Sequence, residues 1–70
     1  MDDLAQKIGH AIRNYRIDQN ITQEKLALLC NIDRSYLGRI ERGEVNITVL
    51  KLYEIAQTLQ IEPHELLPRN

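Results

Sequence analysis

The sequence predicts an all-α fold, a compact bundle of five short helices in a single domain spanning residues 1–70. Three observations support this prediction. Apolar residues recur three or four positions apart in several segments, which is the spacing of one face of an α-helix. Residues that favour helix starts and helix ends flank those segments. No stretch alternates apolar and polar residues as a half-buried strand would, and no repeat or low-complexity tract interrupts the pattern.

The first predicted helix begins after Asp2 or Asp3 and ends at Gln19 and Asn20. Aspartate is a good N-cap because its carboxylate accepts hydrogen bonds from the unpaired N–H groups of the first turn. The apolar residues fall on one face at helical spacing: Leu4, Ile8, Ile12 and Tyr15.

Residues 22–43 predict a second and a third helix joined by a tight turn. Thr22 is the expected N-cap of the second helix, and Asp33 is that of the third. Gly43 follows the third helix, at the position where a left-handed backbone is common and where glycine adopts it with the least strain. The apolar residues of the two helices are Leu26, Ala27, Leu29 and Cys30, then Leu37 and Ile40.

Only Asn31 and Ile32 separate these two helices, so the chain must turn sharply. Asparagine suits such a turn because it tolerates positive φ better than most residues. Two short helices joined in this way form a helix-turn-helix arrangement.

Residues 44–47 are expected to form a loop, and Thr48 caps a fourth helix. Pro63 suits the first turn of a last short helix containing Leu66 and Leu67, because its missing N–H would be unpaired there. Pro68 ends that helix. The buried face of the fourth helix is predicted to contain Leu52, Ile55, Ala56 and Leu59.

The charge is distributed unevenly, although the net charge is only −1. Residues 13–42 carry six basic and four acidic side chains, whereas residues 43–70 carry two basic and four acidic ones. The positive charge therefore surrounds the predicted helix-turn-helix, where attraction to phosphate would require it.

Composition excludes several classes of function. The single Cys30 allows no internal disulfide, and no apolar run is long enough to span a bilayer, so we expect a cytoplasmic protein without a membrane partner. His10 and His64 are not spaced relative to Cys30 as the ligands of a metal site would be. Nothing resembles a nucleophile with its base, and a chain this short leaves little room for a pocket. We therefore expect that the protein is not an enzyme and that it binds no metal, cofactor or small-molecule ligand.

The chain resembles the Cro and phage-repressor type of helix-turn-helix protein, also called the xenobiotic-response-element family. The resemblance covers residues 8–67 and includes TQ-xx-LA at the second helix, IERG at the end of the third, and Leu-xx-Ile-Ala-xx-Leu in the fourth. Within the family, NIDRSYLGRIERG followed by Asn46 is most similar to the controller proteins of restriction-modification systems. Phage and plasmid repressors are the competing subgroup. Controller proteins usually have a basic residue before that asparagine, where this chain has Val45.

The resemblance implies a lambda-repressor-like fold whose third helix enters the major groove of double-stranded DNA. The base-reading residues that it implies are Arg34, Ser35, Tyr36 and Arg39, and the DNA-backbone contacts are Gln23, Arg42 and Asn46. Arginine suits base reading because its two parallel donors match O6 and N7 of guanine.

Two further charged residues have a structural interpretation. The family often pairs the positions of Arg16 and Glu41, and a buried ion pair would connect the first helix to the end of the third.

These inferences predict a transcriptional regulator that binds a pseudo-palindromic operator as a homodimer, with the acidic C-terminal part, from the fourth helix to Leu67, as the dimer surface. The alternative is a protein-interaction module, antitoxin-like or an anti-regulator, which uses the same fold to hold a protein partner. The negative net charge and Val45 favour that alternative.

Overall fold

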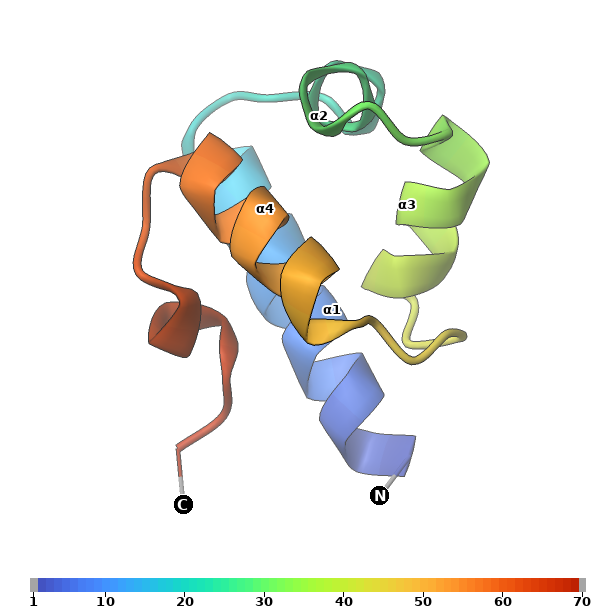
Figure 1. Ribbon diagram of the computed structural model, residues 1–70, viewed down its shortest axis with the longest axis vertical. Coiled ribbons are helices and arrows are strands. Elements are labelled where there is room, and N and C mark those ends of the chain that lie inside the picture. The colour runs from blue at the N-terminus through green and yellow to red at the C-terminus, as the bar shows by residue number, and fades with distance from the viewer. Residues whose placement is uncertain (1, 70) are drawn as a thin grey trace.

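Four α-helices and one 3₁₀ helix make up the computed structural model, which describes residues 2–69 (Figure 1). The elements in chain order are α1 (Asp2–Asp18), α2 (Gln23–Cys30), α3 (Arg34–Glu41), α4 (Val49–Leu59) and η1 (Pro63–Leu66). The all-α class predicted from the sequence is confirmed. Within residues 2–69, no helix is both long and apolar enough to cross a membrane.

The predicted fifth α-helix is instead the 3₁₀ helix η1. The backbone N–H groups of Glu65 and Leu67 bond the carbonyls three residues earlier, of Glu62 and His64, and Leu67 is already extended. A single short turn of this kind is the usual form of 3₁₀ structure. As a result, Leu66 lies in the helix and is buried, whereas Leu67, also expected in this helix, follows it and is exposed.

The N-termini of the middle helices follow from their capping residues. The hydroxyls of Thr22 and Thr48 accept hydrogen bonds from the backbone N–H groups of Lys25 (3.0 Å) and Lys51 (3.1 Å). Each threonine thereby satisfies one of the donors that the first turn leaves unpaired. Asp33 has the extended backbone of an N-cap, but its side chain makes no capping hydrogen bond.

All four α-helices end in the same capping motif. One residue adopts positive φ and its N–H bonds the carbonyl three residues earlier, while the next N–H bonds the carbonyl five residues earlier. This is the Schellman motif, which satisfies carbonyls that the last turn leaves free. The positive-φ residues are Asn20, Asn31, Gly43 and Gln60.

The core lies between the four α-helices and η1, all of which contribute buried side chains to it. Figure 1 shows α4 in front of the upper part of α1. Helices α1 and α3 approach closely at Gly9, since a Cβ built there would lie 2.6 Å from the carbonyl oxygen of Glu41. The largest fully buried side chains are Ile12, Leu26, Leu37, Ile40, Ile55, Leu59 and Leu66.

Two side chains that the apolar pattern placed on the inward faces of their helices are exposed: Leu4 and Leu29. Leu4 and Leu29 lie at the margins of their helical faces, where spacing alone does not separate inward from outward positions. Cys30 is buried as expected, with its sulfur 3.5 Å from the hydroxyl of Thr58.

Candidate nucleic-acid interface

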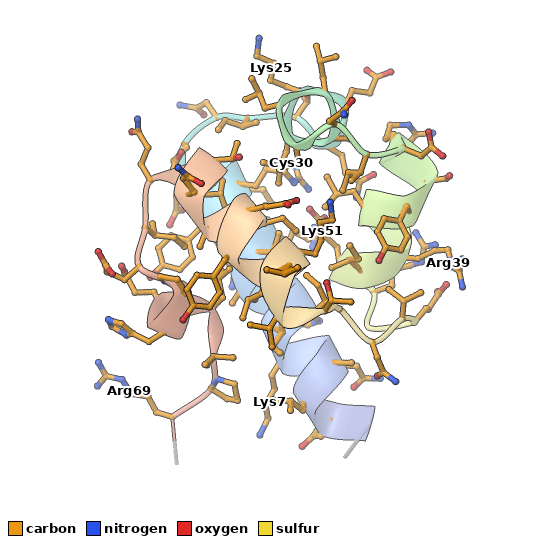
Figure 2. All side chains as sticks on the ribbon, viewed as in Figure 1. Lys7, Lys25, Cys30, Arg39, Lys51 and Arg69 are labelled. Carbon is orange, nitrogen blue, oxygen red and sulfur yellow. The ribbon has the colours of Figure 1, made fainter. Side chains whose placement is uncertain are left out.

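Helix α3 presents a polar face to solvent and an apolar face to the core. Arg34, Ser35 and Arg39 are exposed, whereas Leu37 and Ile40 are buried. Figure 2 shows Arg39 on the side of α3 that faces away from α1 and α4. The outward face therefore offers two guanidinium groups and a hydroxyl, which are hydrogen-bond donors suited to base edges and phosphates.

Tyr36 occupies a different position from the other expected base-reading residues. It is half-buried and packs against the hydrophobic core. A tyrosine in this position fixes its ring by packing while one edge stays accessible at the protein surface.

Arg16 and Glu41 form a buried ion pair behind this face. Arg16 Nε donates to Glu41 Oε2 at 2.8 Å, and Nη2 donates to Oε1 at 3.0 Å. The remaining guanidinium nitrogen, Nη1, donates to the carbonyl of Ile21 at 2.9 Å. Such two-point pairing is the strongest arginine-carboxylate geometry, so α3 is held against α1 in a defined orientation.

Gln23 extends this network to α2. Its amide nitrogen donates to Glu41 Oε1 at 3.0 Å, so the side chain expected at a phosphate is already held on one side. A shallow hollow of about 400 Å³ lies beside it, lined by Thr22, Gln23, Glu24 and Arg34. The hollow thus brings the first turn of α2 together with the first residue of α3.

The rim after α3 contains a second ion pair, one that the sequence did not reveal. Arg42 Nε lies 2.7 Å from Glu44 Oε2, and both side chains are largely exposed. The carboxylate of Glu44 raises the pKa of Arg42. The hydrogen bond from Arg42 lowers the pKa of Glu44, and the charge of Arg39 lowers it further. Glu44 is therefore ionised and close to two arginines of the interface.

Asn46, the other expected backbone contact, lies in the loop between α3 and α4 and is exposed. It lines a hollow with Ile47 of the same loop and with Leu4, Ala5 and Ile8 of α1. The structure thus places Asn46 where the loop meets α1, while Arg34, Ser35 and Arg39 lie on α3 itself.

Four apolar side chains are exposed on α4 and the segment after η1, and we refer to them together as the apolar patch: Val49, Leu50, Tyr53 and Leu67. Leu50 is the most exposed of them at 78%. Leu50 and Tyr53 also line a hollow with Ile61 and Pro63. Spacing had predicted the buried face of α4 but not this outward apolar patch.

The helix-turn-helix family model matches residues 12–66, which is most of the chain. The chain is 37% identical over 60 residues to control protein C.BamHI of Bacillus amyloliquefaciens, covering 84% of this chain and 74% of the relative. It is 34% identical over 67 residues to control protein C.SmaI of Serratia marcescens, covering 96% and 80%.

Solved structures agree with these sequence relatives. The crystal structure of the restriction-modification controller protein C.AhdI from Aeromonas hydrophila superposes with a TM-score of 0.86 at 40% identity, covering 90% of this chain and 96% of that protein. The matched region includes α2 and α3 with the exposed arginines described above. The chain therefore belongs to the helix-turn-helix family of DNA-binding transcription regulators, in which restriction-modification control proteins are among its relatives.

Proposed function

We propose that the protein binds a pseudo-palindromic operator in double-stranded DNA as a homodimer and regulates transcription from it in the cytoplasm. Each protomer would insert α3 into the major groove, with half-sites about one helical turn, roughly 34 Å, apart. The control-protein relatives favour a restriction-modification controller, and a phage or plasmid repressor is the second candidate.

The observation that carries this proposal is the exposed arginine face of α3. Arg34 and Ser35 are the first two residues of α3, and the N-terminal residues of a recognition helix are those that reach base edges. Arg39 lies just over one turn further on. In this proposal Tyr36 contacts a base or the backbone from its packed position.

Three residues near the ends of α3 would contact DNA phosphates and so orient the protein on the duplex. Gln23 lies at the N-terminus of α2, where backbone N–H groups and the helix dipole favour an anion. Arg42 follows α3, and Asn46 is in the next loop. Contacts of this kind fix register and orientation, and they leave sequence reading to α3.

The short length of α3 supports binding by two copies. Its eight residues span about 12 Å along the helix axis, which matches only three or four base pairs of DNA. A site that short recurs throughout a genome. The apolar patch on α4 offers a surface through which a second copy could double the contacted sequence.

Selection from a random-sequence duplex pool tests this proposal. We expect the protein to enrich one palindromic sequence, and we expect the variant Arg34→Ala, Arg39→Ala to lose that enrichment. Each lost arginine contact with guanine corresponds to about 1–3 kcal/mol of discrimination. Affinity of the parent protein should also fall steeply with salt, because phosphate contacts release counterions.

The variant Lys7→Ala, Arg69→Ala is the matched control, since it removes the same charge from positions remote from α3 (Figure 2). It should retain the enriched sequence. Undiminished enrichment by the Arg34, Arg39 variant would exclude base reading by α3. A protein that binds no duplex at low salt would instead favour the protein-interaction module.

A further inference from the structure

The end of α3 differs from the ends of the other three α-helices at one position. In three of the four Schellman motifs an isoleucine follows the positive-φ residue, namely Ile21, Ile32 and Ile61. All three pack against the core, which is the hydrophobic contact that usually accompanies this motif. After α3 the same position is occupied by the exposed Glu44. Capping does not require a carboxylate there, so the glutamate calls for another explanation.

The capping motif fixes where Glu44 stands. Its N–H bonds the carbonyl of Arg39 at 2.9 Å, and the N–H of Gly43 bonds that of Ile40 at 3.0 Å. Gly43 has φ +75°, and a Cβ at this position would also lie 2.6 Å from a side-chain carbon of Gln6. No other residue fits there without strain, and the backbone of Glu44 is accordingly held beside the last turn of α3.

The side chain of Glu44 engages Arg42 through both carboxylate oxygens. Arg42 Nε donates to Oε2 at 2.7 Å and Nη2 donates to Oε1 at 3.4 Å. Arginine presents the same pair of donors to a phosphate. A guanidinium that already holds a carboxylate in this way must release it before it can hold a DNA phosphate in the same geometry.

Arg42 also lies beside the residues that the proposed function assigns to DNA. A Cβ built on Gly38 would contact both Arg42 Nη1, at 3.1 Å, and Gln23 Oε1, at 3.6 Å. Arg42 and Gln23 are thus neighbours over Gly38, and the charge of Arg39 also lowers the pKa of Glu44. The carboxylate stands inside the interface and reduces its positive charge.

We propose that Glu44 is an internal counter-ion that Arg42 exchanges for a DNA phosphate, and that it thereby lowers both the affinity for DNA and its salt dependence. This inference rests on the proposed function. In this proposal Glu44 sets the affinity for DNA without having to contact the DNA. Because nonspecific attraction to phosphate is weakened, the contacts of α3 with the bases supply a larger share of the binding free energy.

The variant Glu44→Gln tests this because glutamine keeps the shape of the side chain and removes its charge. The probe is a fluorescent random-sequence duplex pool of about 30 base pairs, long enough for two half-sites. We expect binding about two- to fivefold tighter at about 50 mM salt. The slope of log K against log salt should steepen by up to about 0.9 for each arginine that gains a phosphate.

Glu54→Gln is the matched control. Glu54 pairs with Lys51 at the same distance of 2.7 Å and is similarly exposed, but both residues lie on α4. Glu54→Gln removes an equal charge from a similar ion pair. If this variant gained as much affinity for DNA as Glu44→Gln, the effect would be one of net charge alone, and the inference would be overturned. Sedimentation equilibrium of all variants verifies equal molar mass.

A double-mutant cycle isolates the role of Arg42. In the Arg42→Ala background, Glu44→Gln should raise the affinity for DNA only slightly, because there is no Arg42 guanidinium to be released from the carboxylate. A full gain in that background would contradict exchange through Arg42. If the parent protein binds duplex DNA and Glu44→Gln leaves affinity and salt slope unchanged, the inference fails while the proposed function stands. A parent protein that binds no duplex overturns both.

Discussion

Glu41 is a charged side chain almost enclosed by protein, with 4% of its surface exposed. It accepts two hydrogen bonds from Arg16 and one from Gln23, so elements α1 and α2 both meet α3 at this carboxylate. Burying two charges costs desolvation energy that their attraction only partly repays. The larger effect comes from removing one partner, which leaves the other charge buried alone.

We therefore predict that Glu41→Ala destabilises the domain by about 3–5 kcal/mol, because Arg16 then stays buried without its counter-ion. Thermal unfolding followed by circular dichroism measures this loss. Asp18→Ala is the control, since Asp18 is exposed, and it should change stability by less than about 0.5 kcal/mol. An unchanged melting temperature in Glu41→Ala would show that the pair does not brace the fold.

Glu65 connects the C-terminal segment to α1. Its carboxylate accepts hydrogen bonds from the backbone N–H of Glu62 at 2.9 Å and from the hydroxyl of Tyr15 at 3.0 Å. The Glu62 N–H, followed by the Tyr15 hydroxyl, lowers the pKa of Glu65 below its usual value. A carboxyl group whose pKa is lower in the folded state stabilises the fold above its unfolded pKa.

That stabilisation should disappear as the pH falls through the folded pKa of Glu65, on the acid side of about 4.3. The variant Glu65→Gln has no such titration. We expect the parent to melt at a higher temperature than this variant at neutral pH, and the difference to shrink as the pH is lowered toward about 3. Melting curves at a series of pH values would contradict this if the difference were constant.

At the scale of elements, the four shared capping motifs determine where each helix stops. Asparagine and glycine adopt positive φ readily, and they fill three of the four positions. Gln60 at the end of α4 has φ +61° and lacks that tolerance. The backbone at this residue is therefore strained, and a glycine would relieve the strain.

We predict that Gln60→Gly raises the unfolding free energy by about 0.5–1 kcal/mol, the left-handed penalty less the entropy that glycine loses on folding. Gln57→Gly is the matched control within α4. There glycine replaces a residue in helical conformation and should destabilise by about 1 kcal/mol. Chemical denaturation measures both variants, and loss of stability in Gln60→Gly would argue against strain at this residue.

The sequence predicted most of the helix boundaries because they depend on local chemistry. Thr22 and Thr48 cap their helices, and Asn31 makes the turn between α2 and α3, as their residue types suggested. The 3₁₀ form of η1 was missed because a Pro start is compatible with either kind of helix. Exposed apolar residues such as Leu29 were missed because periodicity does not reveal which neighbours cover a face.

The candidate site divides in the same way. The family resemblance implied Arg34 and Arg39 as base-reading residues, and the structure has both exposed. The pairing of Arg42 with Glu44 could not be predicted, since it depends on how the chain reverses at Gly43 after α3. The signal available in the sequence was a glutamate where the ends of the other helices have isoleucine.

At the scale of the whole molecule, the positive and apolar surfaces lie on different elements. The arginines belong to α3, and the apolar patch of Val49, Leu50, Tyr53 and Leu67 belongs to α4 and the segment after η1. Figure 1 shows α3 and η1 on opposite sides of α4. A second copy packed on the patch would thus leave α3 of each protomer free, with room for two half-sites.

We predict that Leu50→Glu converts the proposed dimer into monomers, because it would place a charge in an apolar contact that must lose its water. Sedimentation equilibrium measures the molar mass, and circular dichroism should show unchanged helicity since Leu50 is exposed. Affinity for the selected palindrome should fall by at least about tenfold, because each half-site then binds alone.

Leu28→Glu is the control for this prediction. Leu28 is 73% exposed, close to the 78% of Leu50, but it lies on α2. The same substitution on that helix should leave the dimer intact, which separates a specific interface from a general effect of added charge. A dimer that survives Leu50→Glu and dissociates in Leu28→Glu would move the interface from α4 to α2. Such an interface would lie on the last turn of α2, in the same helix whose first residue, Gln23, is proposed to meet a phosphate.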